Sequence, residues 1–271
     1  MNRLIRNCVL AANCIVLGIA TQAVASSAAK LDHAQIDLRD SASLQAGAKT
    51  FVNYCLNCHS ASMMRYNRLR DIGLTEEQIR ENLLFTADKV GAMMNVGMSR
   101  KDGKDAFAAT PPDLSVIARS RGADWLYTYL RTFYRDPSTP TGWNNLLFER
   151  VAMPHALWTL SGQAALDVRE FKSEEAAVAA KLQTRSFSVL EHVGEGESRR
   201  YLLKTLSASN TGLQTAAQYD TTVRDLVNYL VWMGEPDQLF RNHVGIVVLF
   251  ALLILLVLTW ALYKNFWKDV H

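Results

Sequence analysis

Five consecutive residues constrain this chain of 271 residues more than any other feature: Cys55-Leu56-Asn57-Cys58-His59. The pattern C-x-x-C-H is the attachment signature of c-type haem. Two thiols three residues apart on a helix lie on one face, with Cβ atoms about 5–6 Å apart, so both can add to the vinyl groups along one edge of a porphyrin. The next residue, His59, can then give its imidazole to the iron as the proximal ligand. The spacing therefore predicts one covalently bound haem c.

Two other kinds of site use a pair of cysteines at this spacing. A thioredoxin-like redox pair is expected in a βαβ setting, which the sequence around Cys55 does not supply. Half of a zinc site would need a third and a fourth ligand at metal spacing. The other cysteines, Cys8 and Cys14, fall in the expected leader, and the remaining histidines are scattered singly. Haem attachment is therefore favoured over both alternatives.

The first 25 residues have the features of a secretory signal peptide. Arg3 and Arg6 form a positive n-region, residues 9–19 a short apolar core, and residues 23–25 an A-x-A cleavage site. The apolar run is too short to span a bilayer. We therefore expect cleavage after Ala25 and a domain outside the cytoplasm, where bacterial haem attachment takes place.

The composition agrees with an exported globular domain. Hydrophobic residues make up 49% of the chain and charged residues 20%, which is typical of a folded rather than a disordered protein. The formal net charge is +3, and the basic residues are interleaved with acidic ones, which argues against a nucleic-acid partner. The mature chain keeps only Cys55 and Cys58, which the haem would use, so it has no disulfide framework. Its stability must therefore come from its core and its covalent cofactor.

Residues 244–263 are twenty residues without a charge. A helix of this length rises about 30 Å, the thickness of the hydrocarbon core of a bilayer. Aromatic residues and lysines follow or end the run: Trp260, Tyr263, Lys264, Trp267 and Lys268. With an exported N-terminus, the positive-inside rule places these lysines in the cytoplasm. The run therefore predicts a single transmembrane helix that anchors the protein to a lipid bilayer.

Helical periodicity dominates the rest of the chain. Apolar residues at helical spacing over 41–59 bring the haem motif near the end of a helix, and Thr75 with Gln78 forms a capping box for another. The other expected segments are helices over 113–122, 123–135 and 172–183, a helix capped by Asp220-Thr221 that ends at Gly234, helix or turn over 62–69, a loop over 88–110, and a β-hairpin over 187–204.

These segments predict a mostly α-helical c-type cytochrome domain with a small β-hairpin insertion and one C-terminal transmembrane helix. The expected layout is a signal peptide over 1–25, a periplasmic cytochrome c domain over 26–240, a transmembrane helix over 244–263 and a cytoplasmic tail over 264–271.

The spacing leaves the sixth iron ligand open. A thioether on the far face of the haem makes a low-spin electron carrier with a raised potential. Met153 is the best candidate, because Pro154 holds it in an extended conformation. His155 is its rival and would give bis-histidine coordination with a lower potential. The candidate cofactor ligands are therefore Cys55, Cys58, His59 and one of these two residues.

The other methionines are less suited to this role. Met63 and Met64 follow His59 too closely to reach the far face of the haem, and Met233 sits at core spacing on an expected helix. Met93, Met94 and Met98 lie in the expected loop and remain possible ligands.

The motifs together resemble a known family. The segments C-L-N-C-H-S, M-R-Y-N-R-L, P-P-D-L-S-V-I-A-R-S-R and V-A-M-P-H, followed by a terminal apolar helix, look like cytochrome c1 of the cytochrome bc1 complex, especially its bacterial forms. The resemblance covers residues 35–160 and 220–271. Residues 163–218 match none of the family's motifs, and Trp125 stands where related sequences often carry tyrosine.

The resemblance implies a set of site residues and partners. Met153 would be the sixth ligand, Pro112 would lie against the haem, and Arg121 would make a charge-assisted contact near a propionate. The haem would take one electron from the Rieske iron–sulfur protein and pass it to cytochrome c, beside cytochrome b in a dimeric complex of the bacterial inner membrane. Such a chain acts in catalysis only as a subunit of a quinol–cytochrome c oxidoreductase.

Other functions are compatible with the motif itself. A free-standing membrane-anchored cytochrome that shuttles electrons to a terminal oxidase would keep the same ligands. A haem enzyme or gas sensor would need an open sixth position, and a thiol oxidoreductase would need Cys55 and Cys58 as free thiols.

Overall fold

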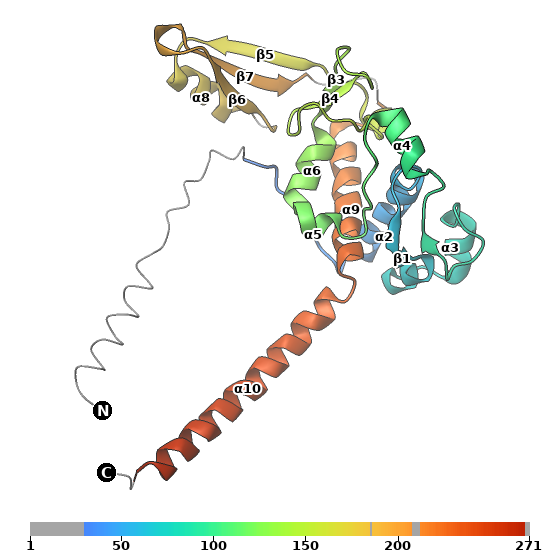
Figure 1. Ribbon diagram of the computed structural model, residues 1–271, viewed down its shortest axis with the longest axis vertical. Coiled ribbons are helices and arrows are strands. Elements are labelled where there is room, and N and C mark those ends of the chain that lie inside the picture. Colours follow the sequence, from blue (N-terminus) through green and yellow to red (C-terminus); the bar gives the residue numbers. More distant parts are fainter. Residues whose placement is uncertain (1–29, 185, 208–211, 269–271) are drawn as a thin grey trace. The chain divides into compact units, whose positions relative to one another are not determined.

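The computed structural model describes residues 30–184, 186–207 and 212–268 (Figure 1). The expected signal peptide and its cleavage site at Ala25, together with the last residues of the expected tail, lie outside the described residues. Labels of helices and strands follow Figure 1.

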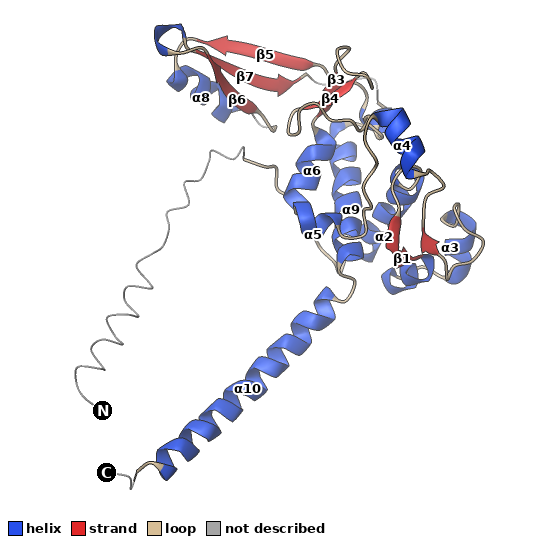
Figure 2. Ribbon diagram, viewed as in Figure 1, coloured by secondary structure: helices blue, strands red, loops and turns tan. Residues whose placement is uncertain are grey.

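Helices make up most of the regular structure, as predicted (Figure 2). The α-helices are α2 (Ser41–Thr50), α3 (Glu76–Asn82), α4 (Arg100–Phe107), α5 (Ile117–Arg121), α6 (Ala123–Arg131), α7 (Trp158–Ser161), α8 (Glu174–Gln183), α9 (Ala216–Gly234) and α10 (Gln238–Phe266). A π-helix, η1 (Phe51–Cys55), continues α2, and the 3-10 helices are η2 (Tyr66–Ile72) and η3 (Gly196–Ser198).

The strands form small antiparallel sheets. They are β1 (Ala61–Arg65), β2 (Met93–Met94), β3 (Phe133–Arg135), β4 (Trp143–Asn145), β5 (Leu166–Phe171), β6 (Val189–Val193) and β7 (Arg200–Leu206). β1 pairs with β2, β3 pairs with β4, and the third sheet has the order β5-β7-β6.

Helices α2 and α9 pack against each other at the centre of the core. Gly47 makes this approach possible, because a Cβ atom there would lie 2.0 Å from the carbonyl oxygen of Asp225. Ser43 donates a hydrogen bond of 2.7 Å to the Asp225 carboxylate, and the rings of Phe51 and Tyr229 lie 5.5 Å apart between centroids. The contact places the end of α2, and the C-x-x-C-H motif that follows it, against the long helix α9.

The start of α9 differs from the prediction. The helix begins at Ala216, not at Asp220-Thr221, because Thr215 and Gln218 form a reciprocal capping box. Asp220 lies within the helix and accepts a hydrogen bond of 2.7 Å from Arg131. The end of the helix at Gly234 agrees with the prediction.

Two segments expected as helix, turn or loop contain strands. Residues 61–65 form β1, which pairs with β2 inside the stretch expected as a loop over 88–110. The same stretch also contains α4, whose N-terminus is a capping box between Ser99 and Asp102. Strands this short carry no periodic signal, so their pairing depends on the surrounding tertiary structure.

The predicted helices over 113–122 and 123–135 are both shorter in the structure. α5 begins at Ile117, because the Asp113 carboxylate accepts backbone hydrogen bonds from Ser62 and Ser115 and holds a turn in place of a helix. α6 ends at Arg131, and the next residues form β3 against β4.

The predicted β-hairpin is present, with a third strand that the sequence did not indicate. β6 and β7 form the hairpin, and β5 pairs along the other side of β7. Helix α8 contacts all three strands, and Ala177 of α8 and Leu203 of β7 are fully buried. Ala165 and Ser207 close the base of this insertion, since the Ser207 N–H donates to the Ala165 carbonyl at 2.9 Å.

Helix α10 includes the whole of the predicted transmembrane segment, residues 244–263. The helix is long and apolar enough to cross a membrane, and none of its residues is buried in the protein. By length and composition it fits a membrane-anchored protein.

Candidate haem site

The C-x-x-C-H residues form one hydrogen-bonded turn that begins at Cys55, the last residue of η1. The backbone N–H groups of Cys58 and His59 both donate to the carbonyl of Cys55, at 3.1 and 2.9 Å. Leu56 between the cysteines is fully buried, whereas Asn57 is exposed. The two half-buried thiols and the imidazole therefore project from a single turn, as attachment of a haem requires.

The turn before the motif is π-helical, which periodicity did not indicate. The N–H of Leu56 donates to the carbonyl of Phe51 five residues earlier, at 3.0 Å. One extra residue in a turn rotates the following side chains by about 100° relative to an uninterrupted α-helix. Such single π turns are frequent at functional sites. Here it sets the direction in which Cys55 and the residues after it leave α2.

His59 is buried, with 9% of its surface exposed, and its ring is oriented by the backbone of a distant loop. Its Nδ1 lies 2.7 Å from the carbonyl oxygen of Pro112. Because a carbonyl only accepts hydrogen bonds, Nδ1 carries the proton and the lone pair of Nε2 is available to a metal. Burial lowers the pKa of His59, although the Pro112 carbonyl and Asp113 oppose the effect. The imidazole is thus neutral and fits an iron ligand.

The loop that carries Pro112 is held tightly to the segment after His59. The Asp113 carboxylate accepts from the N–H groups of Ser62 and Ser115, both at 2.8 Å. The N–H of Leu114 donates to the Ser60 carbonyl, also at 2.8 Å. Three short hydrogen bonds around one aspartate and one carbonyl therefore fix the Pro112 oxygen where it meets His59.

The cysteines do not have the properties of a thiol redox pair. Burial, with a smaller contribution from Cys58, raises the pKa of the Cys55 thiol to about 12, and burial also raises the pKa of Cys58. Reactive thiols in oxidoreductases have lowered pKa values, because the thiolate is the nucleophile. The thiol oxidoreductase alternative is therefore disfavoured.

The zinc alternative lacks ligands in the part of the chain that the structure describes. Across residues 30–184, 186–207 and 212–268, no group of three or more His, Cys, Asp or Glu side chains is placed to hold a metal ion. A structural zinc site needs four such ligands.

Met153 is half-buried and packs against the core. The hydroxyl of Tyr129 donates a hydrogen bond of 3.5 Å to its sulfur. The other candidate methionines lie in different surroundings: Met93 is 41% exposed, whereas Met94 is fully buried, with its sulfur 3.7 Å from the Tyr229 hydroxyl. The sulfur of Met153 is thus held by a neighbouring side chain while the residue remains partly accessible; Met98 is also half-buried.

His155, the rival ligand, is a core residue with partners of its own. Its Nε2 lies 2.8 Å from the Ser161 hydroxyl, and its ring stacks on Phe133 with centroids 4.8 Å apart. Burial lowers the pKa of His155 to about 3. Since its Nε2 is hydrogen-bonded to Ser161 and its ring is stacked in the core, the geometry favours Met153 over His155.

Arg121 and Pro112, which the resemblance implied near the haem, are both exposed. The Arg121 guanidinium lies 5.1 Å from the centroid of the Trp125 ring, and Trp125 in turn stacks on Tyr129 at 4.8 Å. Arg121 and Trp125 border a surface hollow of about 460 Å³. Trp125 has no hydroxyl, so it contributes a flat ring where related sequences often carry tyrosine.

Sequence reasoning missed Tyr129 and Asp113. Tyr129 follows Trp125 by four residues on an amphipathic helix, which is the spacing of an ordinary core residue.

A larger hollow of about 730 Å³, near Arg131, His155 and Tyr219, contains none of the predicted cysteine, histidine or methionine ligands other than the rival His155.

Residues 33–165 and 211–270, well over half of the chain, match the model of the Cytochrome C1 family. The chain belongs to the cytochrome c1 family. Members of this family are electron-transfer haem subunits of the cytochrome bc1 complex, and the prediction of haem c agrees with this membership.

Individual relatives cover most of the chain. It is 42% identical to a protein named cytochrome c1 from Allochromatium vinosum, over 89% of this chain and 90% of that protein. It is 47% identical to a protein named ammonia monooxygenase gamma subunit from Nitrosomonas europaea, over 89% of both chains. A mitochondrial cytochrome c1 of Solanum tuberosum, named as a heme protein, is 30% identical over 36% of this chain and 45% of that protein.

The Cytochrome C1 family model leaves a gap between its two matched regions, and this gap contains the insertion. The unmatched residues 166–210 contain β5, α8, β6, η3 and β7. The matched regions contain every residue predicted to touch the haem. The predicted haem residues therefore all lie outside the insertion.

Proposed function

We propose that Cys55 and Cys58 bind one haem c through thioether bonds and that His59 and Met153 are its axial ligands. The observation that carries this proposal is the hydrogen bond from His59 Nδ1 to the Pro112 carbonyl, which leaves Nε2 available on the same turn as the two thiols. A haem held in this way supplies one-electron redox chemistry.

The chain's own residues would orient the ligands and exclude water. The hydrogen bonds at Asp113 hold the Pro112 carbonyl, which holds the His59 ring in one tautomer and one orientation. Pro112 would contact the haem, and Arg121 would make a charge-assisted contact with a propionate. Its exposed guanidinium on the rim of the hollow beside Trp125 supports this last assignment.

As a subunit of the bc1 complex, the chain takes electrons from the Rieske iron–sulfur protein and passes them to cytochrome c. Its neighbours are cytochrome b and the Rieske protein, and the complex is a dimer. Helix α10 spans the bacterial inner membrane, with the haem domain over 26–240 in the periplasm and residues 264–271 in the cytoplasm. The lysines at 264 and 268 support this orientation. Catalysis belongs to the complex, and the chain contributes electron transfer.

The first test is purification in mild detergent followed by a reduced-minus-oxidised spectrum of the co-purifying material. We expect c-type and b-type bands together, with quinol-dependent reduction of cytochrome c. A lone c-type haem would instead identify a free-standing anchored cytochrome that serves a terminal oxidase. Co-purification with ammonia-oxidising subunits would assign the chain a role like the one named for the Nitrosomonas europaea relative.

Replacing Met153 tests the axial ligand. Met153→Lys should lower the haem potential strongly, because an amine is a harder donor than a thioether and favours the ferric state. Met63→Lys is a matched control, since Met63 is 77% exposed and should leave the potential unchanged. Potentiometric titration of the purified complexes checks both. A Met153→Lys protein with the wild-type potential would exclude Met153 as a ligand.

A further inference from the structure

We propose that Tyr129 is a positioning residue for Met153, and that its hydroxyl stays hydrogen-bonded to the thioether sulfur in the haem-loaded protein and raises the haem potential. This inference rests on the proposed ligation of the iron by Met153. It assigns a redox-tuning role to a side chain that lies outside the haem motif and outside the V-A-M-P-H segment.

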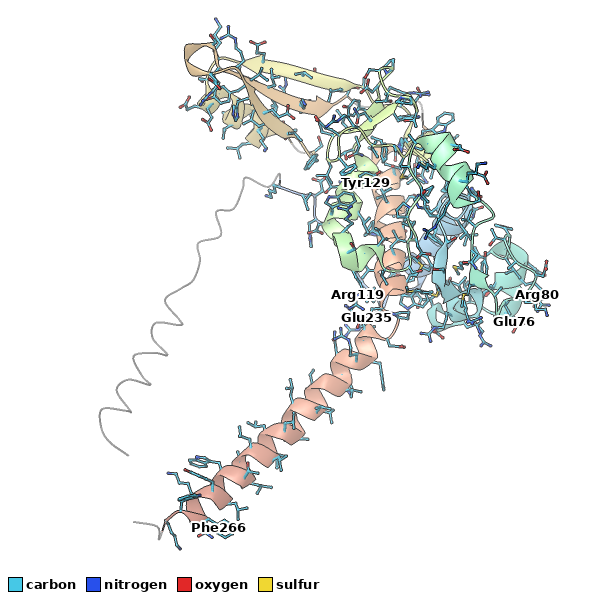
Figure 3. All side chains as sticks on the ribbon, viewed as in Figure 1. Glu76, Arg80, Arg119, Tyr129, Glu235 and Phe266 are labelled. Atoms are coloured by element: carbon cyan, nitrogen blue, oxygen red, sulfur yellow. The ribbon has the colours of Figure 1, made fainter. Side chains whose placement is uncertain are left out.

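The contact itself is well placed for this role. Tyr129 lies on α6 (Figure 3), with 9% of its surface exposed, and its hydroxyl is 3.5 Å from the Met153 sulfur. A thioether sulfur has two lone pairs. One can bind iron while the other accepts a hydrogen bond, so ligation does not require the Tyr129 contact to break. Tyrosine keeps its proton at neutral pH, and burial raises the pKa of Tyr129 further.

The tyrosine ring is held on two sides by aromatic neighbours, one on α6 and one on β3. Trp125 stacks on it with centroids 4.8 Å apart and an angle of 12° between the planes. Phe133 meets it edge-on, at 5.0 Å and 69°. Such aromatic pairs attract each other beyond the effect of the area that they bury. The direction of the hydroxyl is thus set by packing, before any ligand is considered.

The segment that carries Met153 is held at a second point by the same aromatic face. Phe133, four residues after Tyr129, stacks on His155, two residues after Met153, with the planes only 4° apart. Because the Tyr129 contact to Met153 and the Phe133 contact to His155 are present together, they hold the segment at two points and fix the position of the sulfur.

The expected electronic effect follows from the donor strength of sulfur. A hydrogen bond withdraws electron density from the thioether, which makes it a weaker donor to ferric iron and favours the ferrous state. Low polarity around a buried contact strengthens the effect. Removing the hydroxyl should therefore stabilise the oxidised haem and lower the potential.

The test is Tyr129→Phe in the full chain within the purified complex, because this change keeps the ring and removes only the hydroxyl. We expect the ratio of reduced to oxidised haem at a fixed ambient potential to fall roughly three- to tenfold, where tenfold corresponds to about 59 mV for one electron. The sulfur-to-iron charge-transfer band should move as well. Tyr127→Phe is the matched control, because Tyr127 lies on the same helix but its ring contacts the guanidinium of Arg131. This variant should change neither readout.

A second variant distinguishes the effect of the hydrogen bond from a change in packing caused by Tyr129→Phe. Site-specific 3,5-difluorotyrosine at position 129 makes the phenol a stronger hydrogen-bond donor, so the potential should rise, opposite in sign to Tyr129→Phe. A role of the ring alone predicts no such opposite shifts. If both variants keep the wild-type potential and band while the wild type shows methionine ligation, the inference is overturned and the proposed function stands. Ready uptake of carbon monoxide by the reduced wild type would instead overturn the ligation itself.

Discussion

At the scale of single residues, the orientation of the proposed haem ligand depends on groups that lie far from it in the sequence. His59 is oriented by a carbonyl oxygen of Pro112, fifty-three positions along the chain. That carbonyl is placed by Asp113, an exposed aspartate that accepts hydrogen bonds from Ser62 and Ser115. The motif therefore supplies the ligand, and the loop over 111–115 supplies its orientation.

Asp113→Asn should destabilise the folded domain in a pH-dependent way. Burial raises the pKa of Asp113, but hydrogen bonds from Ser115 and Ser62 outweigh it and hold the pKa below the ordinary value of 3.8. A carboxyl with a lowered folded-state pKa stabilises the fold above about pH 4, and this contribution is lost as the pH falls through the folded-state pKa. The difference in unfolding free energy between wild type and variant should therefore be largest near neutral pH.

Chemical denaturation followed by circular dichroism at pH 7 and pH 3 measures this difference. Asp105→Asn, a change at an exposed aspartate of α4, is the control and should have little effect at either pH. An Asp113→Asn variant that is destabilised equally at both pH values would show that the charge of Asp113 does not contribute.

At the scale of secondary-structure elements, the contact between α2 and α9 places the haem motif. The helices approach closely at Gly47, where an added Cβ would lie 2.0 Å from the Asp225 carbonyl and 2.6 Å from the Tyr229 Cβ. Neither atom is the far end of a flexible side chain. The helices would have to separate to admit a methyl group, and the turn that carries Cys55 continues directly from α2.

Gly47→Ala should therefore destabilise the protein even though alanine favours helices. We expect overpacking to lower the free energy of unfolding by about 1–3 kcal/mol. At most sites of this kind, that loss exceeds the gain of about 1 kcal/mol from the better helix propensity of alanine. Thermal unfolding should show a fall of several degrees in Tm, about 2–4 °C per kcal/mol for a domain of this size. Gly97→Ala is the control, because nothing lies within 4 Å of its added Cβ. Equal Tm values for wild type and Gly47→Ala would contradict a tight contact.

At the scale of the whole molecule, the chain combines a family core, an insertion and an apolar helix. The residues proposed to hold the haem lie in the matched regions, and the insertion over 166–206 begins and ends at neighbouring residues. Ala165 and Ser207 exchange backbone and hydroxyl hydrogen bonds of 2.9 and 3.0 Å. An ion pair of 2.9 Å between Lys204 and Glu149 also ties the insertion to the loop after β4.

Replacing residues 166–206 by a short glycine linker should leave the haem site intact. Because the two ends already meet, the linker closes without strain, and we expect one covalent haem with the wild-type potential. A haem-stained gel and a potentiometric titration of the shortened chain measure both properties. Lys204→Met serves as the companion variant, since it keeps the insertion but removes the ion pair with Glu149, together with the pair that Lys204 makes with Glu191 of β6. Loss of haem from the shortened chain, with haem retained by Lys204→Met, would show that the insertion supports the fold.

The sequence alone determined the features whose signals are local. The C-x-x-C-H motif lies within one helical turn, the capping box of Thr75 and Gln78 is confirmed, and the apolar run over 244–263 lies within one helix. Each of these depends on residues at most a few positions apart or on composition summed along a single helix. For this reason the family, its haem and the apolar helix could be inferred without coordinates.

The tertiary structure decided everything that depends on distant segments meeting. Asp220-Thr221 has the residue types of a helix cap, yet the helix begins at Ala216 after the capping box of Thr215 and Gln218, and Asp220 inside the helix is paired with Arg131 from α6. β5 became a strand by pairing with β7, more than thirty residues later. Spacing left both Met153 and His155 open as ligands, whereas packing gave His155 a core partner and Met153 a hydrogen bond from Tyr129. Periodicity records which face of an element is apolar, and only the folded chain decides which side chains those faces bring together.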